Sequence, residues 1–264
     1  ITGLQPAALA PTVLVGFCGG GGDTFGFKDA GFEVIGGAEK VEKIRRVWET
    51  LFEVDAFSDI GLLSKTDFLS TFVFSSSSPC TDMSPAGSQK GWLGLRTAMY
   101  ITQVTEAINA KVPCIQLEQV VSATKIFNGQ EDLGSPQSVL EQKLERAGYR
   151  VFTKSINAAF VGGLVDRERL HTIAISTELF QYHTVLGGEP FIFKFPKENR
   201  PEIKTVSVAA QTLWPPPDHL VMEDEELQEF NISRGVSLVN PRNTNDTIRE
   251  GDQCSPWLLT PGTG

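Results

Sequence analysis

The chain is short of basic residues, of paired cysteines and of long apolar runs, and each shortage excludes a class of protein. Its 264 residues carry 23 Lys and Arg against 32 Asp and Glu, a net charge of −9. No stretch approaches the ~18 apolar residues that a membrane helix needs, so we expect no membrane association. The cysteines have no paired spacing, which argues against a disulfide framework or a metal site and favours a reducing compartment: Cys18, Cys80, Cys114 and Cys254.

The acidic excess is uneven along the chain. Residues 1–176 hold 16 basic and 19 acidic residues, whereas residues 177–264 hold 7 and 13. Neither part has the basic stripe that usually marks a nucleic-acid-binding surface. The N-terminus has no basic region ahead of its short apolar stretch, so no secretory signal is expected. Because the chain starts with Ile1 rather than Met, we expect it to be a fragment.

Residues 12–176 alternate short apolar runs with helical patterns, which predicts an α/β fold with a mostly parallel sheet and helices on both faces. The pattern changes after Ser176, where proline-rich joints appear, so we expect one domain over 1–180 and a second region over 181–264. The expected strands are Thr12–Phe17, Glu33–Gly37, Thr71–Ser75, Val112–Leu117, Tyr149–Asn157 and Leu170–Ser176. The expected helices are Thr24–Ala30, Val41–Phe52, Leu95–Asn109 and Pro136–Ala147.

A glycine-rich turn follows the first expected strand and precedes a helix. Four successive glycines, residues 19–22, are more than a tight turn requires, and such a turn lets a ligand approach bare backbone amides. Glu39 follows Gly19 by 20 residues, at the end of the next strand, where an acid can bind ribose hydroxyls. Asp59 and Ile60 end a third short β segment, where Asp59 can meet an adenine amino group. The alternative is a flexible loop, but the combination favours a nucleoside cofactor.

Cys80 is the candidate nucleophile of the chain. A lone cysteine is usually a small buried hydrophobe, as we expect of Cys18 and Cys114. Cys80 instead follows a strand and has polar, irregular neighbours, which predicts an accessible thiol at the ligand-binding edge of the sheet. Glu118 ends the next strand at the same edge, although alone it would be read as a surface acid. The segment 166–169, Asp-Arg-Glu-Arg, would alone be read as a charged turn.

Together, these features resemble the C5-cytosine methyltransferase family. The run Gly16–Gly22, with Ala30–Phe32 after it, resembles the cofactor motif of that family. Ser78–Gly87 is similar to the Pro-Cys loop, and Leu117–Val120 to the Glu-Asn-Val box. Leu164–Ile173 resembles the Arg-x-Arg segment. The four motifs occur in the family's order over residues 12–176.

The resemblance implies a Rossmann-like class I S-adenosylmethionine-dependent methyltransferase that methylates C5 of a flipped cytosine in DNA. It implies that Cys80 attacks C6, that Glu118 acts at N3, and that Arg167 and Arg169 hold the base or its backbone. It further implies a monomer, cytoplasmic in a bacterium or virus and nuclear in a eukaryote. The residues implied to bind S-adenosylmethionine are Phe17, Cys18, Gly19, Gly20, Gly22, Glu39, Asp59, Ile60, Pro79 and Met99.

The sequence departs from the family pattern at several positions. An acid that usually opens the first motif is Val15 here, the residue after Cys80 is Thr81 rather than Gln, and Gln119 replaces Asn. Val165-Asp166 replaces Pro-Gln before the arginines. Residues 250–264 resemble the opening of the target-recognition region, and the family's last motif is missing. Two alternatives therefore stay open: a tRNA-cytosine methyltransferase of the same family, and a degenerate member that binds cofactor or a partner without catalysis.

Overall fold

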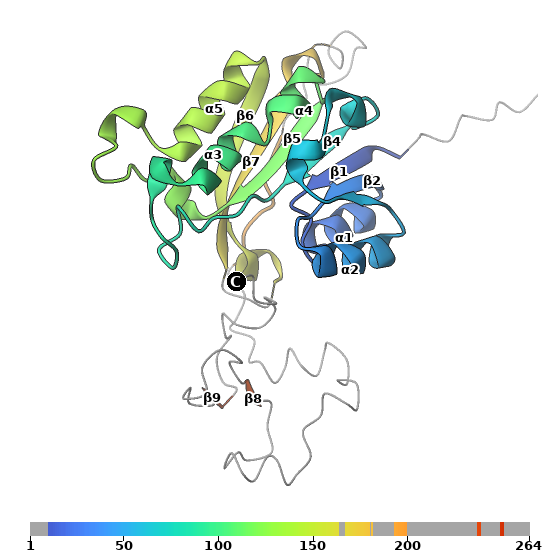
Figure 1. Ribbon diagram of the computed structural model, residues 1–264, viewed down its shortest axis with the longest axis horizontal. Helices are drawn as coiled ribbons and strands as arrows, with labels where there is room; N and C mark the ends of the chain where they lie inside the picture. Colours follow the sequence, from blue (N-terminus) through green and yellow to red (C-terminus); the bar gives the residue numbers. More distant parts are fainter. Residues whose placement is uncertain are drawn as a thin grey trace, which may run out of the picture. The chain divides into compact units, whose positions relative to one another are not determined.

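The computed structural model describes residues 10–163, 167–179, 181 and 193–199, together with the backbone of 237–238 and 249–250. Its main element is a seven-stranded sheet with the order β3-β2-β1-β4-β5-β7-β6 (Figure 1). The neighbouring pairs from β3 to β5 are parallel, and β7 runs antiparallel to β5. The strands are β1 Thr12–Gly16, β2 Glu33–Ala38, β3 Ala56–Phe57, β4 Val73–Ser76, β5 Cys114–Gln119, β6 Tyr149–Asn157 and β7 Glu168–Ser176.

Helices connect the strands, as a parallel sheet requires. The α-helices are α1 Gly22–Asp29, α2 Glu42–Phe52, α3 Leu95–Thr102, α4 Thr105–Asn109 and α5 Pro136–Arg146. Short 3₁₀ turns complete the connections: η1 Ile60–Leu62, η2 Lys65–Phe68, η3 Gly91–Leu93, η4 Val121–Thr124, η5 Glu131–Leu133 and η6 Ala158–Val161. The expectation of a mostly parallel sheet is confirmed.

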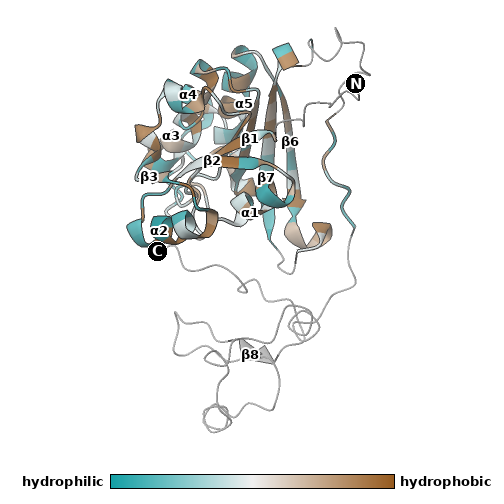
Figure 2. Ribbon diagram, turned by 90° about the vertical axis from the view of Figure 1, so that its right-hand side faces the viewer, coloured by the Kyte–Doolittle hydropathy of each residue, from teal (hydrophilic) through white to brown (hydrophobic). Residues whose placement is uncertain are grey.

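Alternate residues of the same strands pack into two different cores, so helices cover both faces of the sheet. Val13 and Val15 of β1 contact the cluster that contains Trp48 of α2. Leu14, between them, belongs to the cluster that contains residues of α3, α4 and α5, including Tyr100. Because strand side chains alternate between faces, this division is what a two-sided sheet requires. The apolar colouring of β1 in Figure 2 reflects burial on both sides.

One expected helix is wrong in extent. The apolar pattern predicts a single helix over Leu95–Asn109, but the structure ends α3 at Thr102 and begins α4 at Thr105. In a continuous helix the carbonyls of Tyr100 and Ile101 would pair with amides four residues on. Here the Gln103 side chain donates to the Tyr100 carbonyl at 3.0 Å, and Lys143 of α5 donates to the Ile101 carbonyl at 2.9 Å. Side-chain donors therefore bind carbonyls at the break.

Two compact units divide the chain. One comprises Ile1–Ser155 with Leu170–Lys194, and the other comprises Ile156–Arg169 with Phe195–Gly264. In the second unit, β8 Ser237–Leu238 pairs antiparallel with β9 Arg249–Glu250. The boundary expected near residue 180 stays a prediction, and the segment 251–264 lies outside the described residues. Among the described helices, none has the length and apolar character needed to cross a membrane.

Candidate active site

The glycine-rich turn joins β1 to α1 at the carboxyl edge of the sheet. Gly21 has a φ of 87°, and a Cβ there would lie 2.4 Å from the Phe52 ring, so only glycine fits. Gly20 and Gly22 differ, because a Cβ on either would meet nothing within 4 Å. Their backbone amides have no acceptor among the described residues. The turn therefore offers open amide donors at a helix N-terminus, the arrangement that binds carboxylates and phosphates.

Glu39 lies beside this turn, as its spacing predicts. It directly follows β2, and its carboxylate accepts hydrogen bonds from the amides of Gly19 at 3.2 Å and Val41 at 2.7 Å. The two bonds use different oxygens, so the carboxylate is held in one orientation. Each carboxylate oxygen can accept a further hydrogen bond. The fold thus brings Gly19 of the glycine-rich turn next to Glu39 at the end of β2.

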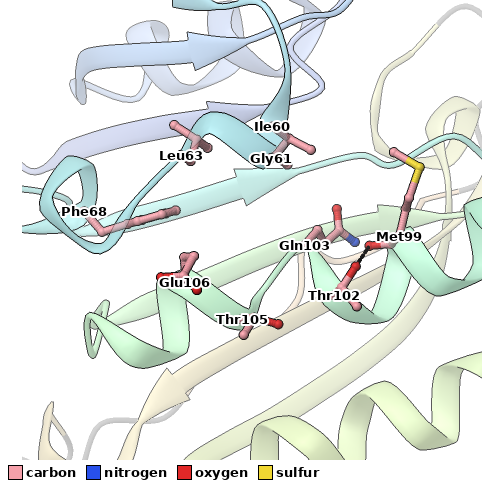
Figure 3. Close-up of a pocket in the computed structure, with 9 residues that line it drawn as sticks. All are labelled: Ile60, Gly61, Leu63, Phe68, Met99, Thr102, Gln103, Thr105 and Glu106. Carbon is pink, nitrogen blue, oxygen red and sulfur yellow. Dashed lines mark hydrogen bonds between the residues drawn. The ribbon is translucent and has the colours of Figure 1, made fainter.

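Ile60 and Met99, two of the expected cofactor-binding residues, line one pocket of about 270 Å³ (Figure 3). The pocket lies between the η1–η2 segment and the α3–α4 segment, and its lining is completed by Gly61, Leu63, Phe68, Thr102, Gln103, Thr105 and Glu106. Asp59 precedes Ile60 and caps η1 by accepting from the Gly61 amide at 2.8 Å. Its other oxygen lies 3.5 Å from Lys40. Asp59 is two residues past the end of β3 rather than on it.

Phe17 and Cys18 take different roles in the turn. Phe17 is half-buried with a φ of 52°, a left-handed conformation that is uncommon for an aromatic residue. Cys18 is buried, and its side chain packs in the core with Trp48. Burial, together with the charges of Glu39 and Asp23, raises the pKa of Cys18 to about 12. A ligand at this turn can therefore meet only the backbone of Cys18.

Cys80 begins a loop that is folded back on itself. The Cys80 carbonyl accepts hydrogen bonds from the amides of Met83 at 2.9 Å and Ser84 at 2.8 Å. Gly87 packs so closely on Thr81 that an added Cβ would lie 2.0 Å from the Thr81 carbonyl oxygen. Cys80 and Pro79 are partly buried, and the Cys80 side chain packs against the larger core. The thiol is thus less exposed than its polar neighbours predict.

Asp82 organises the rest of this loop. Its carboxylate accepts from the Ser88 hydroxyl at 2.8 Å and from the Arg96 amide at 2.8 Å. Burial alone would raise the pKa of Asp82. These hydrogen bonds, with the positive charges of Arg96 and Lys90, outweigh burial and hold its pKa below the usual value. Arg96 also donates to the Thr81 hydroxyl at 2.6 Å, so the residue after Cys80 is tied to α3.

Gln119 joins the Pro-Cys loop to the strand end that carries Glu118. Glu118 is partly buried in β5 and lies opposite His171 in the antiparallel pairing of β5 with β7. The Gln119 side chain donates to the carbonyl of Ser78 at 3.2 Å and to its hydroxyl at 3.3 Å. Ser78 precedes Cys80 by two residues, so this link fixes the loop of Cys80 relative to β5. Sequence reasoning recorded Gln119 only as a departure and missed its role.

The remaining cysteines and arginines are placed as follows. Cys114 is partly buried in β5, and burial raises its pKa to about 12. Cys18 and Cys114 are therefore neutral thiols at pH 7.

The Arg167 carbonyl accepts from the Ala158 amide at 3.0 Å, and Arg169 donates to the Glu168 carbonyl at 2.8 Å. Both arginines belong to the second compact unit, so their contact with a substrate base stays a prediction.

Asp23, in the first turn of α1, is a charged residue that the sequence analysis did not select. Its carboxylate accepts from the Thr24 amide at 2.8 Å and from the Ser75 hydroxyl of β4 at 3.3 Å. Burial, with a smaller contribution from the charge of Glu118, raises its pKa to about 6. Its position directly after the glycine run is the feature of the sequence that could have indicated a place in the site. Perturbed acids of this kind concentrate at functional sites.

Comparisons with known proteins identify relatives of the chain. The C-5 cytosine-specific DNA methylase family model matches residues 15–253. The type II methyltransferase M.HaeII of Haemophilus aegyptius is 27% identical over 173 residues, covering 65% of this chain and 52% of the relative. M.NgoBI of Neisseria gonorrhoeae is 26% identical over 164 residues, covering 62% and 50%. The chain thus spans about half the length of these curated relatives.

Solved structures share the fold. The Entamoeba histolytica methyltransferase EhMeth superposes with a TM-score of 0.59 at 13% identity, covering 83% of this chain and 64% of that one. A DNMT2 mutant of Spodoptera frugiperda gives a TM-score of 0.51 at 15% identity, covering 81% and 60%. The strand order and the glycine-rich turn are typical of class I methyltransferases. Because the family model matches most of its length, the chain belongs to the C-5 cytosine-specific DNA methylase family.

Proposed function

We propose that the protein transfers a methyl group from S-adenosylmethionine to C5 of cytosine in DNA. The observation that carries the proposal is the hydrogen-bonded link between Gln119 and Ser78. It holds the Pro-Cys loop against the strand end that bears Glu118, so a thiol and an acid can act on one small ring. Membership of the DNA methylase family and two type II methyltransferase relatives favour DNA over RNA.

The residues at the sheet edge fit S-adenosylmethionine. The open amides of Gly20 and Gly22 suit the carboxylate of its methionine part, and the fixed carboxylate of Glu39 suits its ribose hydroxyls. Phe17, Ile60 and Met99 offer apolar contact for adenine, and Asp59 an acceptor for its amino group. Pro79 lies beside Cys80 at the same edge. When bound, the cofactor supplies a methyl group on a positively charged sulfur.

The protein's residues then make cytosine C5 nucleophilic. The thiolate of Cys80 adds to C6, forming an S–C6 bond and moving a ring electron pair towards N3. Glu118 supplies a proton or hydrogen bond at N3 as that charge develops. C5 can then attack the methyl carbon, which breaks the bond of that carbon to the cofactor sulfur and leaves the sulfur as a neutral thioether. Loss of the C5 proton to water, return of the N3 proton to Glu118 and expulsion of the Cys80 thiolate restore the aromatic ring.

Substrate access imposes a further requirement. C5 and C6 cannot reach Cys80 while the base is stacked in a duplex, so the target nucleotide must be flipped out. Arg167 and Arg169 are the proposed groups that hold the flipped base or its backbone. The net charge of −9 provides little attraction for phosphates, so we expect this chain by itself to bind DNA weakly.

The test is transfer of a radiolabelled methyl group by the full-length protein to cytosine-containing DNA and, separately, to tRNA. We expect label in DNA and in 5-methylcytosine after digestion. Label confined to tRNA would show that the substrate is RNA, and the proposed chemistry at C5 would still hold. Absence of label in both, from protein that binds S-adenosylmethionine, would favour a non-catalytic member of the family.

A further inference from the structure

Asp23 lies next to the proposed cofactor site and has no part in the mechanism above. Of the acids near the glycine turn, Asp29 is exposed at the far end of α1, whereas Asp23 stands in its first turn. The end of β1 provides no acid, since Val15 is apolar and is fully buried in the core cluster that contains Trp48. Asp23 is therefore the only described acid between β1 and the end of α1 that faces the sheet.

The carboxylate of Asp23 is held in place by neutral donors. One oxygen accepts from the Thr24 amide at 2.8 Å and the other from the Ser75 hydroxyl at 3.3 Å. Thr24 is itself fixed, because the Trp48 indole donates to its hydroxyl at 3.0 Å. Ser75 is fully buried near the C-terminal end of β4, so this oxygen of the carboxylate faces the sheet. Asp23 thus has a fixed orientation rather than that of a freely rotating surface acid.

The negative charge of Asp23 is uncompensated. Among the residues that the structure describes, no lysine or arginine pairs with it. The charge of Glu118, which has the same sign, acts on it unfavourably. A partly desolvated carboxylate without a counter-ion is unfavourable, and such groups are commonly retained to bind a cation.

Amide donors and an acid stand together at the start of α1. Gly20 and Gly22 offer open amides, and Asp23 follows directly in the chain. An α-amino acid zwitterion carries its carboxylate and its ammonium on the same carbon, so it needs a donor group and an acceptor group side by side. We propose that Asp23 binds the α-ammonium group of the methionine part of S-adenosylmethionine. This inference rests on the proposed function and adds a cofactor-binding residue to it.

The test measures ligand binding by calorimetry at pH 7.5 with the full-length protein and its Asp23→Asn variant. Asparagine is isosteric and removes only the charge. Three ligands separate the groups: S-adenosylhomocysteine carries both ammonium and carboxylate, its decarboxylated form keeps the ammonium alone, and 5′-methylthioadenosine lacks both. Asp29→Asn is the matched control, because it removes one exposed charge from the same helix.

We expect Asp23→Asn to weaken binding of both ammonium-bearing ligands by about 10-fold or more, as a lost charge-assisted hydrogen bond implies. Binding of 5′-methylthioadenosine should not change, and Asp29→Asn should bind all three as the wild type does. Equal affinities in wild type and Asp23→Asn would overturn the role of Asp23 alone. So would an equal loss for all three ligands, since that would show a general disturbance of the site. A wild type that binds none of them would instead refute the proposed cofactor, and the role of Asp23 with it.

Discussion

The two halves of the sheet edge hold their functional residues by different means. Around β1 and β2, the backbone positions the functional groups: glycine conformations shape the turn, and two main-chain amides orient Glu39. Around β4 and β5, side chains hold one another, with Gln119 on Ser78 and Asp82 on Ser88. Replacing a side chain should therefore leave the shape of the first half intact, whereas it should loosen the second.

The largest expected effect comes from Cys80→Ser in the second half. A serine hydroxyl is not ionised near neutral pH and adds poorly to C6, so methyl transfer should fall by about three orders of magnitude or more. Cofactor binding should be unchanged, because the first half of the edge is untouched. Methyl transfer and calorimetry on the same protein check both statements.

Covalent trapping sharpens this result. DNA with 5-fluorocytosine at the target position should form a stable complex with the wild type, since fluorine blocks the final elimination, and none with Cys80→Ser. Cys114→Ser and Cys18→Ser serve as controls, because burial keeps both thiols neutral. Trapping by Cys80→Ser at the wild-type level would place the nucleophile elsewhere.

The second prediction concerns the link between the loop and β5. Gln119→Ala removes the donor to the buried Ser78 carbonyl and hydroxyl, which should lower the free energy of unfolding by about 2 kcal/mol. Methyl transfer should fall by about 10-fold or more, because Cys80 would no longer be held relative to Glu118. Urea unfolding and steady-state kinetics measure the two effects.

Gln142→Ala is the matched control for this variant, since Gln142 is exposed on α5 and its loss should change the unfolding free energy by less than about 0.5 kcal/mol. If Gln119→Ala behaves like Gln142→Ala, the loop is held by other contacts. The contrast between the two halves of the edge would then be lost.

The same contrast explains what sequence could and could not predict. Periodicity and glycine placement predict the order of strands and helices, and the 20-residue spacing predicts that Glu39 meets the turn, as the Gly19 amide shows. These features depend on backbone geometry, which local residue types largely determine. The break between α3 and α4 depends on Lys143, some 40 residues further along the chain, and no local pattern contains it.

Side-chain partnerships across the fold were likewise beyond prediction. From the sequence, Gln119 is only a departure from the Asn of the family pattern, yet its reach to Ser78 is set by the spacing of β4 and β5. Asp23 was passed over because its meaning depends on Ser75, 52 residues away. The buried thiol of Cys18 was expected from its type, but its raised pKa also reflects Glu39 and Asp23.

The third prediction tests the backbone-held half. Glu39→Ala should weaken S-adenosylmethionine binding by about 1.5 kcal/mol, roughly tenfold, because a charge-assisted hydrogen bond to ribose is lost. Glu33→Ala, at the other end of β2 and exposed, is the control. Calorimetry on both variants decides the matter. An unchanged affinity in Glu39→Ala would remove the ribose role, while the turn amides could still bind the methionine carboxylate.

The smallest effect, and the one that separates function from stability, is expected at Asp23. Its pKa is about 6 in the folded protein against an ordinary value of 3.8, so the folded state binds more protons than the unfolded state between those values. Its contribution to stability is therefore favourable below about pH 4 and is lost as the pH rises through 6. Asp23→Asn should consequently stabilise the protein near pH 8 by on the order of 1 kcal/mol, with the gain shrinking at lower pH. Glu118 and Cys18, which lie within electrostatic reach of Asp23, remain in both proteins and cancel in the comparison.

Urea unfolding of the two proteins across this pH range measures the difference. A variant that is more stable at pH 8 yet binds the cofactor less well would mean that Asp23 is kept for its ligand, at a cost to the fold. A variant that is less stable at pH 8 would mean instead that the carboxylate is retained for its bonds to Thr24 and Ser75.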